Sequence, residues 1–582
     1  MGLRLAKMTP RSREDIMTFR HNPRQRSRSP NSPAHGRAPS PVALGPPPDE
    51  FLQPEHVQDA IAVLTWNLSA VNNNPFEYWL TYEDSAYLDL MMGVEYFLDQ
   101  PGEDDVEVGE VFTNSMFEEL KAILVKEAMD GLEEVEAMWH GGEMRLKQRR
   151  IITEFVKDKS LGDKRLISMP DRVTNTVNVV TRKESKYQPP PICRPSVMNN
   201  FEGDLSSTDV WWEQWRRFMF QDPLTVKNKE GIAVMRPVEM LTQISRNKYP
   251  AISEEEERLS VPLQILCLAI FDAIIVHLMN ALSPEDSWQV VKSEICDKLY
   301  KGKNKRSAQI LADRYAAVDV MCLQEVAAVF MDTFLKSTLP STHAIVMPEM
   351  LDGKRDQNSV LILSRTSFVV ESIREVTAEL AQFLGEGHTL MDGDLVAVEV
   401  QRVKDGRQCL VVSFHGDTNG LLTVPMLTAV DRALKERFVG HLCIFGLDAN
   451  TYEKPDETKQ GFTDCLWRIS ELGLTTCWGE TPLVRSCSTT CSARTSLQPQ
   501  LNKAVCLADR VLNANMDPKD LIVFYRDQLV QVTPEDMGEG RQRNPLKDNT
   551  GRLEFKERTI FPTMEFPSDH GIVAVVLQPA SA

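Results

Sequence analysis

Short apolar runs recur in two parts of the chain, near its start and throughout its second half. Runs of this length, bounded by polar residues, are typical of strands that are buried on both faces. They predict strands at Ile61–Trp66, Val318–Leu323, His343–Met347, Ser359–Leu363, Leu395–Arg402, Gln408–Phe414, Leu442–Leu447, Lys519–Phe524 and Gly571–Leu577. Helical spacing in the second half predicts helices at Ala308–Tyr315, Leu421–Phe438 and Gly461–Leu472. The stretches Thr475–Leu501 and Asp536–Glu557 are expected to be irregular.

Between about Glu83 and Arg306 the apolar spacing becomes that of helices. It predicts helices at Ala86–Leu98, Ser115–Met129, Leu132–Lys157, Val210–Phe220, Pro237–Ile244 and Val261–Leu282. Loops are expected at Tyr187–Pro195, Asn199–Asp204 and Asp222–Asn228. We interpret residues 83–305 as a mostly helical insertion or a separate helical module, because no catalytic constellation is visible there.

Two apolar features of this region have more than one interpretation. Trp211, Trp212 and Trp215 fall at helical spacing, which favours core packing over a platform for stacked bases. The run Val261–Leu282 is long enough to span a membrane, but it contains Asp272 near its centre, where a charge is costly. We therefore predict a buried core helix and no stable membrane insertion.

Residues 1–50 are rich in Arg, Ser and Pro and are predicted to be a disordered basic tail. The tail contains Ser29 and Ser40, each followed by Pro, so it could carry an import or phosphorylation signal or bind RNA. A plain solvated tail is the interpretation that its composition favours.

The whole chain has 582 residues and a formal net charge of -18. Such a charge argues against a surface that coats nucleic acid non-specifically, and it is compatible with a site that gathers divalent cations. The 11 Cys residues form no repeating framework, which indicates reduced thiols and predicts an intracellular location, cytoplasmic or nuclear. Cys487 and Cys491 form a CxxxC pair without a partner pair, so a structural zinc site is not predicted.

Polar side chains of a restricted kind adjoin the predicted strands. Asp448 and Asn450 follow one strand at i and i+2, so both can point to the same side of its end. Taken alone, this pair is also what a common Asx turn looks like. The complete set contains only carboxylates, carboxamides and imidazoles: Asn67, Glu325, His415, Asp448, Asn450, Asp520, Asp569 and His570. The repetition favours a shared site over scattered turns.

These residue types suit hydrolysis of phosphoesters. Oxygen ligands bind Mg²⁺ or Mn²⁺, an Asp can hold or deprotonate an attacking water, and an Asp–His pair can orient an imidazole. The sequence has no GxSxG elbow, P-loop or Rossmann glycine fingerprint.

The order of these motifs resembles the endonuclease/exonuclease/phosphatase superfamily, which has the DNase I-like fold. The matching pieces are Thr65–Asn67, Leu323–Val326, His415, Asp448–Asn450, Asp520 and Ser568–His570. The resemblance implies an α+β fold, a four-layer α/β/β/α sandwich, formed by residues 51–82 and 306–582 around the helical insertion.

The resemblance also implies roles. Glu325 corresponds to the main metal ligand, with Asn67 beside it and Asp569 as a second carboxylate on the metal side. Asp448 corresponds to the residue that positions or deprotonates the attacking water. Asn450 and His415 correspond to phosphate contacts, and His570 to the imidazole that contacts the scissile phosphate and is oriented by Asp520.

The motifs do not identify the substrate. Leu447 separates Gly446 from Asp448, where the family usually has Gly followed directly by Asp, and no subfamily motif matches. We expect a Mg²⁺-dependent (or Mn²⁺-dependent) phosphodiesterase, with RNA or DNA among its candidate substrates. The alternatives are a phosphatase or lipid phosphodiesterase of a small anionic substrate, and a non-catalytic binding protein on the same scaffold.

Overall fold

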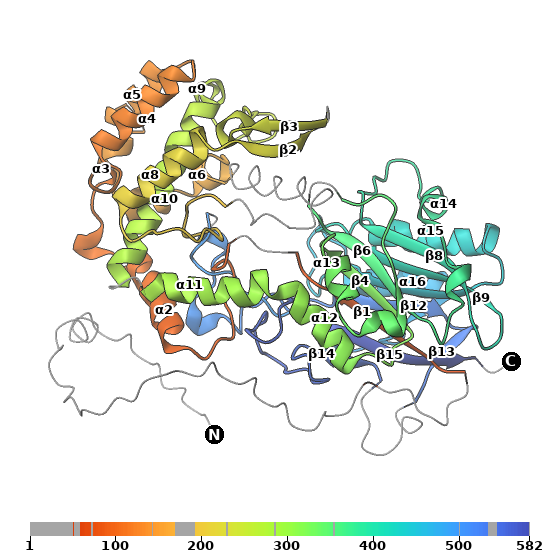
Figure 1. The fold of residues 1–582 in the computed structure, drawn as a ribbon. Coiled ribbons are helices and arrows are strands. Elements are labelled where there is room, and N and C mark those ends of the chain that lie inside the picture. The colour runs from red at the N-terminus through yellow and green to blue at the C-terminus, as the bar shows by residue number, and fades with distance from the viewer. Residues whose placement is uncertain are drawn as a thin grey trace, which may run out of the picture. The chain divides into compact units, whose positions relative to one another are not determined.

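The structure is a computed structural model of the 582-residue chain. It describes residues 51, 59–70, 74–142, 144–168, 193–228, 231–283, 287–352, 355–499, 501–533 and 544–580. The predicted tail at 1–50 and most of the Pro-rich loop at 187–195 lie outside the described residues. Figure 1 shows the arrangement of the helices and strands.

The first sheet is seven-stranded, with the order β13-β15-β1-β4-β6-β5 and β14 paired to β15. Its strands are β1 (Ile61–Asn67), β4 (Val320–Val326), β5 (His343–Val346), β6 (Asn358–Ser364), β13 (Leu529–Gln531), β14 (Leu546–Asp548) and β15 (Ile572–Pro579). β1 lies between β4, to which it is parallel, and β15, to which it is antiparallel. The first and last strands of the described sandwich are therefore direct neighbours.

The second sheet is six-stranded, with the order β11-β12-β10-β9-β8-β7. Its strands are β7 (Arg374–Glu375), β8 (Leu395–Gln401), β9 (Gln408–His415), β10 (Leu442–Asp448), β11 (Leu474–Thr476) and β12 (Asp520–Tyr525). β10 is parallel to β9 and antiparallel to β12. This pairing places His415, Asp448 and Asp520 side by side, at the same end of three neighbouring strands.

The two sheets pack face to face. One apolar core joins Val63 and Val320 of the first sheet to Val398 and Ile444 of the second. The sheets lie very close together at Gly446, where an added Cβ would lie only 2.5 Å from the Cβ of Cys322. A side chain at this position would push the central strands apart.

Helices cover the outer faces. α14 (Thr377–Ala381), α15 (Thr423–Glu436) and α16 (Phe462–Glu471) pack on the second sheet through one core. α12 (Lys303–Arg314) and α13 (Phe330–Leu335) pack on the first sheet through another. The expected mixed α and β class is confirmed.

The segment between β1 and β4 is mostly helical. Its α-helices are α2 (Ser85–Asp99), α3 (Val108–Val111), α4 (Asn114–Lys126), α5 (Leu132–His140), α6 (Lys159–Asp163), α8 (Thr208–Phe220), α9 (Glu254–Arg258), α10 (Ser260–Leu282) and α11 (Ser287–Cys296). A hairpin of β2 (Leu224–Asn228) and β3 (Gly231–Met235) completes it. Its apolar side chains join the core that covers the first sheet.

Shorter helical turns connect these elements. 3₁₀ turns span Gly102–Asp104, Leu146–Gln148, Pro237–Met240, Leu339–Ser341, Val370–Ser372, Val484–Cys487, Leu501–Lys503 and Leu507–Asp509. π-helical turns span Ile151–Val156 and Asp297–Lys301.

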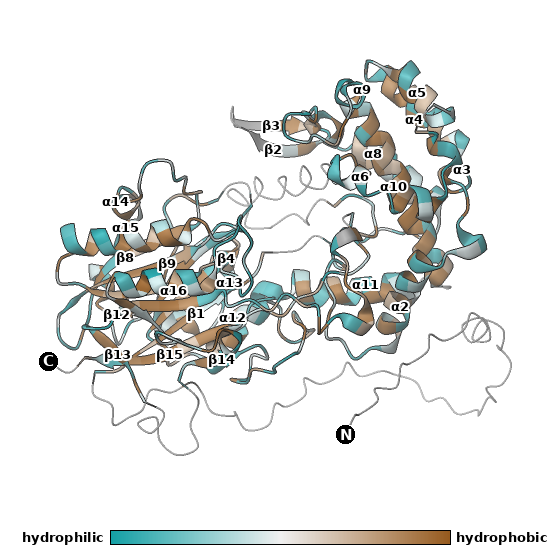
Figure 2. Cartoon of the chain, turned by 180° about the vertical axis from the view of Figure 1, so that it is seen from behind, coloured by the Kyte–Doolittle hydropathy of each residue, from teal (hydrophilic) through white to brown (hydrophobic). Residues whose placement is uncertain are grey.

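α10 is the long apolar helix of the insertion, and it stands out as a brown rod in Figure 2. Its length and hydropathy would allow it to cross a membrane, but 78% of its most apolar window is buried inside the protein. Its polar side chains have partners there: Asp272 pairs with Arg194, Gln264 donates to the carbonyl of Thr242, and Asn280 donates to the carbonyl of Leu205. The helix is a buried core helix, as its polar residues predicted.

Three local predictions in the insertion were wrong. Leu132–Lys157 is not one helix, because α5 stops at His140 and Gly142 takes a positive φ of 65° just beyond. Asp222–Asn228 is not a loop, since Leu224–Asn228 pairs with Gly231–Met235 as a hairpin. Pro237–Ile244 forms only the 3₁₀ turn Pro237–Met240. The prediction for the three Trp residues was right, because Trp211, Trp212 and Trp215 are all buried.

The loops of the second half contain more regular structure than expected. The stretch predicted as irregular at Thr475–Leu501 includes the end of β11 and the 3₁₀ turn Val484–Cys487. The predicted polar loop Asp536–Glu557 includes β14. All 11 cysteines are free thiols, and Cys487 and Cys491 are both buried.

Candidate active site

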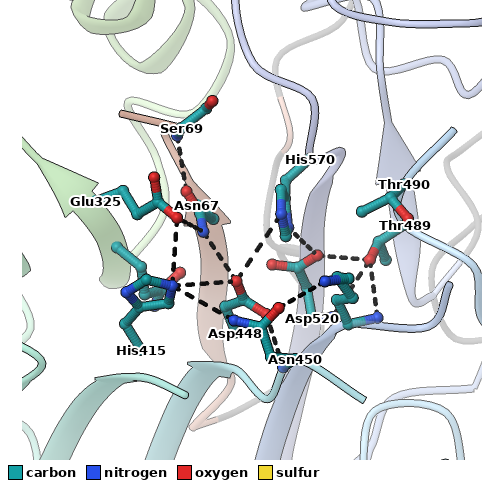
Figure 3. Close-up of polar contacts among 12 residues, drawn as sticks. Asn67, Ser69, Glu325, His415, Asp448, Asn450, Thr489, Thr490, Asp520 and His570 are labelled. Carbon is teal, nitrogen blue, oxygen red and sulfur yellow. Dashed lines mark hydrogen bonds and ion pairs between the residues drawn. The ribbon is translucent and has the colours of Figure 1, made fainter. Parts of the chain in front are cut away.

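Strands from both sheets end at one place and carry polar side chains toward it (Figure 3). β1 supplies Asn67, β4 supplies Glu325, β9 supplies His415 and β10 supplies Asp448. The close packing of the central strands brings these residues together although up to 381 positions separate them in the chain.

Glu325 accepts hydrogen bonds on both of its carboxylate oxygens. Oε1 lies 3.1 Å from Asn67 Nδ2 and 3.2 Å from His415 Nε2. Oε2 accepts from the backbone N–H of Ala70 at 2.5 Å and from Gln357 Nε2 at 3.4 Å. The residue has a φ of 53° at a register shift in β4, so its backbone is strained where its side chain is aimed.

Asn67 links the two acidic residues. Its Nδ2 donates to Glu325 and, at 2.8 Å, to Oδ2 of Asp448. Its Oδ1 accepts from the backbone N–H of Ser69 at 2.7 Å, which fixes the orientation of the amide. The structure thus places a donor, not an oxygen ligand, on the inner side of Asn67.

Asp448 is buried and lies between two imidazoles. Its Oδ2 is 3.7 Å from His415 Nε2 and 3.8 Å from His570 Nε2. Its Oδ1 accepts from the backbone N–H of Asn450 at 2.9 Å. Burial and this turn hold the carboxylate in one orientation, with Oδ2 toward the imidazoles.

Asn450 has a φ of 48°, a second strained residue in the cluster. Its Nδ2 donates to the carbonyl of Gly416 at 2.9 Å and lies 3.5 Å from His415 Nε2. Its Oδ1 accepts from Lys519 Nζ at 2.5 Å. The ammonium of Lys519 therefore adds positive charge beside Asp448.

His570 is oriented from behind. Its Nδ1 lies 3.0 Å from Oδ2 of Asp520, the same oxygen that accepts from the hydroxyl of Thr489. Its backbone is held as well, because its carbonyl accepts from Trp66 Nε1 and its N–H donates to Ser568 Oγ. Nε2, the ring nitrogen opposite to this anchor, faces Asp448.

The charges of the cluster shift its pKa values. Burial alone would lower the pKa of His570, but the carboxylates of Asp520 and Asp448 raise it to about 10. Burial alone would also lower the pKa of His415, but its hydrogen bond to Glu325 and the nearby carboxylates raise it. Burial would raise the pKa of Glu325, and the contacts with His415 and Asn67 instead hold it well below its usual range. The carboxylates therefore favour protonated imidazoles, and the imidazoles in turn favour the ionised form of Glu325.

The residues present fit a divalent cation. Ligand atoms of Glu325, His415 and Asp448 lie within 4.8 Å of one another, and a second such group contains Asp448, Asp520 and His570. Clustered carboxylate oxygens suit Mg²⁺ or Mn²⁺. Glu325 with Asp448 offers the oxygen donors, and Asn67 fits better as the donor that orients both.

Asp569 does not join this group. Within the described residues, its side chain makes no hydrogen bond or ion pair, and it lines a separate cavity with Ala70 and Lys303. Its charge still acts on the cluster, since it helps to raise the pKa of His570. Its role as a second carboxylate on the metal side stays a prediction.

Three residues at or beside the site were not predicted from the sequence. Thr489 lies in a stretch that was expected to be irregular, and no pattern connects it with Asp520. Lys519 stands directly before the strand-opening Asp, which is the one signal that could have found it. Lys303 begins α12, earlier than the predicted helix at Ala308, so its place beside the site was not visible.

The comparisons with known proteins give one family model and a set of solved structures. A family model described as a domain of unknown function (DUF8234) matches residues 105–293, inside the insertion. No curated protein matches the chain.

Solved structures match about half of the chain. The human Nocturnin catalytic domain with bound sulfate is 15% identical, covers 47% of this chain and 87% of its own, and has a TM-score of 0.30. D. rerio TDP2 complexed with a single-strand DNA product is 13% identical, with coverages of 47% and 91% and a TM-score of 0.28.

An endonuclease/exonuclease/phosphatase from Bacteroides vulgatus is 13% identical, with coverages of 51% and 95% and a TM-score of 0.31. It carries the name of the superfamily that the motif order resembles. At TM-scores this low, the fold and the site rest on the strand order and distances of this chain.

Proposed function

We propose that the chain is a divalent-metal-dependent phosphoester hydrolase that acts by in-line attack of a water molecule. The observation that carries the proposal is the position of Asp448. Its buried carboxylate is held by Asn67, lies beside Glu325, and has an imidazole within 4 Å on either side, at 3.7 and 3.8 Å. A turn-capping Asp would need none of these neighbours.

The residues have separate tasks in this reaction. Asp448 holds the water and accepts its proton, because Asn67 and the turn at Asn450 fix its carboxylate. His570 donates from Nε2 to a phosphoryl oxygen, and Asp520 keeps its ring protonated and oriented. Asn450 and Lys519 add a dipole and a charge on the far side of Asp448.

Glu325, with Asp448, would hold the metal ion. A bound Mg²⁺ or Mn²⁺ supplies positive charge that stabilises the developing negative charge on the phosphoryl group. His415 lies against both carboxylates and contacts the phosphate from the second sheet.

The proposed reaction is cleavage of a phosphodiester, and the substrate panel decides its class. Purified protein is assayed with Mg²⁺, Mn²⁺ or EDTA against single-stranded RNA, single-stranded DNA, phosphoinositides, sphingomyelin, bis-p-nitrophenyl phosphate and p-nitrophenyl phosphate. Hydrolysis of diesters but not monoesters supports a phosphodiesterase, and the reverse supports a phosphatase.

Glu325→Gln is the matched variant, since it removes the charge of the central carboxylate and keeps its shape. We expect EDTA and this substitution each to reduce the rate by about 10³-fold. Glu386→Gln, at an exposed position that takes part in none of the contacts of the site, is the control and should leave the rate unchanged. Hydrolysis that survives both EDTA and Glu325→Gln would overturn the mechanism, and the absence of hydrolysis on the whole panel would favour a binding protein.

A further inference from the structure

A cavity of about 70 Å³ lies beside the candidate active site, and the sandwich and the insertion both form its wall. Ala70, Tyr78 and Asp569 line it from the sandwich. Ile295, Tyr300 and Lys303 line it from the end of the insertion and the start of α12. The cavity is thus the place where the helical segment reaches the catalytic edge.

Lys303 is the unusual residue of this wall. It is only 4% exposed, and the one hydrogen bond of its side chain within the described residues runs from Nζ to the carbonyl of Ala70, at 3.2 Å. An ammonium has three N–H groups, and leaving such groups unpaired in a buried place is costly. Burial lowers the pKa of Lys303 to about 8, although Asp569 and Glu325 act in the opposite direction.

The backbone of one residue, Ala70, connects this lysine to the active site. The carbonyl of Ala70 accepts from Lys303, and the N–H of Ala70 donates to Oε2 of Glu325 at 2.5 Å. Asp569, across the cavity wall, directly precedes His570. A group held in the cavity would therefore be attached close to the phosphate on which Glu325 and His570 act.

The charge of the lining limits what can bind. Among the described residues that line it, Lys303 and Asp569 are the only charged side chains, and their opposite signs leave no net charge to bind a second phosphate. The remaining wall is largely apolar or aromatic, with Leu80, Leu299 and Tyr78 among its members. A donor and an acceptor on an apolar wall suit a neutral group that carries a hydroxyl.

We propose that this cavity is a subsite for the alcohol part of the substrate, in which Lys303 and Asp569 bind a hydroxyl group close to the scissile ester. The proposal rests on the proposed phosphoester hydrolysis and names the substrate chemistry of that same site. The hydroxyl could come from a ribose or from a cyclic polyol, and both present the same donor and acceptor.

The test uses matched substrate pairs that differ in hydroxyl groups. One pair is a ribo- and a deoxyribo-oligonucleotide of the same sequence, and the other is the p-nitrophenyl diesters of inositol phosphate and of cyclohexyl phosphate. We expect the full-length protein to prefer the hydroxylated member of one pair by at least about 10-fold in kcat/KM, because its buried polar groups would be unpaired with the other member. The pair that shows the preference identifies the source of the hydroxyl.

Lys303→Met should reduce this preference to near one, while the non-hydroxylated member is still hydrolysed. Lys305→Met, an exposed position on the same helix, is the control and should keep the wild-type ratio. Lys303→Gln retains a donor and should give an intermediate ratio, and it serves as the test if Lys303→Met does not fold. Circular dichroism checks the fold of each variant.

The outcomes separate the two proposals. A protein that hydrolyses both members of each pair equally, or whose preference is unchanged in the Lys303 variants, overturns the subsite and leaves the hydrolase intact. A folded protein that hydrolyses neither these pairs nor any other phosphoester overturns both.

Discussion

The molecule has two buried polar clusters, one in the insertion and one in the sandwich. They differ in how their charged groups are paired. The insertion cluster consists of Arg194, Ser196, Trp215 and Asp272. Both carboxylate oxygens of Asp272 are filled, because Oδ1 accepts from Arg194 and Ser196 and Oδ2 accepts from Arg194 and Trp215. The guanidinium of Arg194 pairs with the carboxylate of Asp272, and this ion pair anchors α10.

The sandwich cluster consists of Asn67, Glu325, His415, Asp448, Asp520 and His570. Here three carboxylates share two imidazoles, and the buried Oδ1 of Asp520 has no hydrogen bond within the described residues. Glu325 carries the strain of a positive φ, and so does the neighbouring Asn450. Crowded charges and a strained backbone are features of functional sites, so the contrast favours a structural role for the first cluster and supports the proposed catalytic role of the second.

The largest expected effect breaks the insertion cluster. Asp272→Asn removes the carboxylate that pairs with the buried guanidinium of Arg194, and we expect the free energy of unfolding to fall by about 3–5 kcal/mol. Urea unfolding followed by circular dichroism measures the change. The activity per folded molecule should stay at the wild-type level.

Asp297→Asn provides the matched control, since Asp297 pairs with Lys301 at an exposed position of the same insertion. Its effect should stay within about 0.5 kcal/mol. An Asp272→Asn protein as stable as this control would show that the insertion cluster does not stabilise the fold.

The next largest expected effect concerns His570, one of the two imidazoles of the sandwich cluster. His570→Gln removes the cation that Asp520 and Asp448 maintain, and we expect kcat to fall by about 10²- to 10³-fold, as for the loss of one donor to a developing anion. Steady-state hydrolysis of the best substrate of the panel measures it. Unchanged kcat with a raised KM would instead assign His570 to substrate binding only.

The smallest expected effect concerns Thr489, which contacts Asp520 and so acts on His570 indirectly. Thr489→Val removes the hydroxyl that donates to Asp520 and keeps the side-chain shape, so His570 becomes less firmly oriented. We expect kcat to fall by about 10-fold, with KM unchanged, in line with the loss of other outer hydrogen bonds. Thr490→Val, at the neighbouring position, should have a smaller effect, because its hydroxyl contacts backbone carbonyls and not Asp520.

The sandwich was largely predictable from the sequence because its strands are buried on both faces. Runs such as the one that ends at Leu447 need no partner to be recognised, and the polar residue that follows each run marks the edge of the sheet. The meeting of Asn67, Glu325, His415 and Asp448 could therefore be expected before their distances were known. Which strands are parallel, and how closely they pack at Gly446, depends on long-range contacts that no local pattern encodes.

The insertion was less predictable, because helical spacing does not show where a helix ends. The break after His140 depends on the glycines that follow it, and the β2–β3 hairpin depends on pairing across a polar turn. The places of Thr489 and Lys303 depend on packing between segments that are distant in the chain. The same limit applies to Asp569, because no local pattern indicates that its side chain lines the neighbouring cavity.

Asp448→Asn tests the central claim most directly, with hydrolysis rate and unfolding free energy measured on the same sample. The substitution keeps the shape of the side chain and removes the base that faces the two imidazoles. We expect the rate to fall by at least about 10³-fold while the free energy of unfolding stays within about 1 kcal/mol of the wild-type value or rises. A variant that hydrolyses its substrate at the wild-type rate, or that loses stability as Asp272→Asn does, would contradict the assignment of this cluster to catalysis.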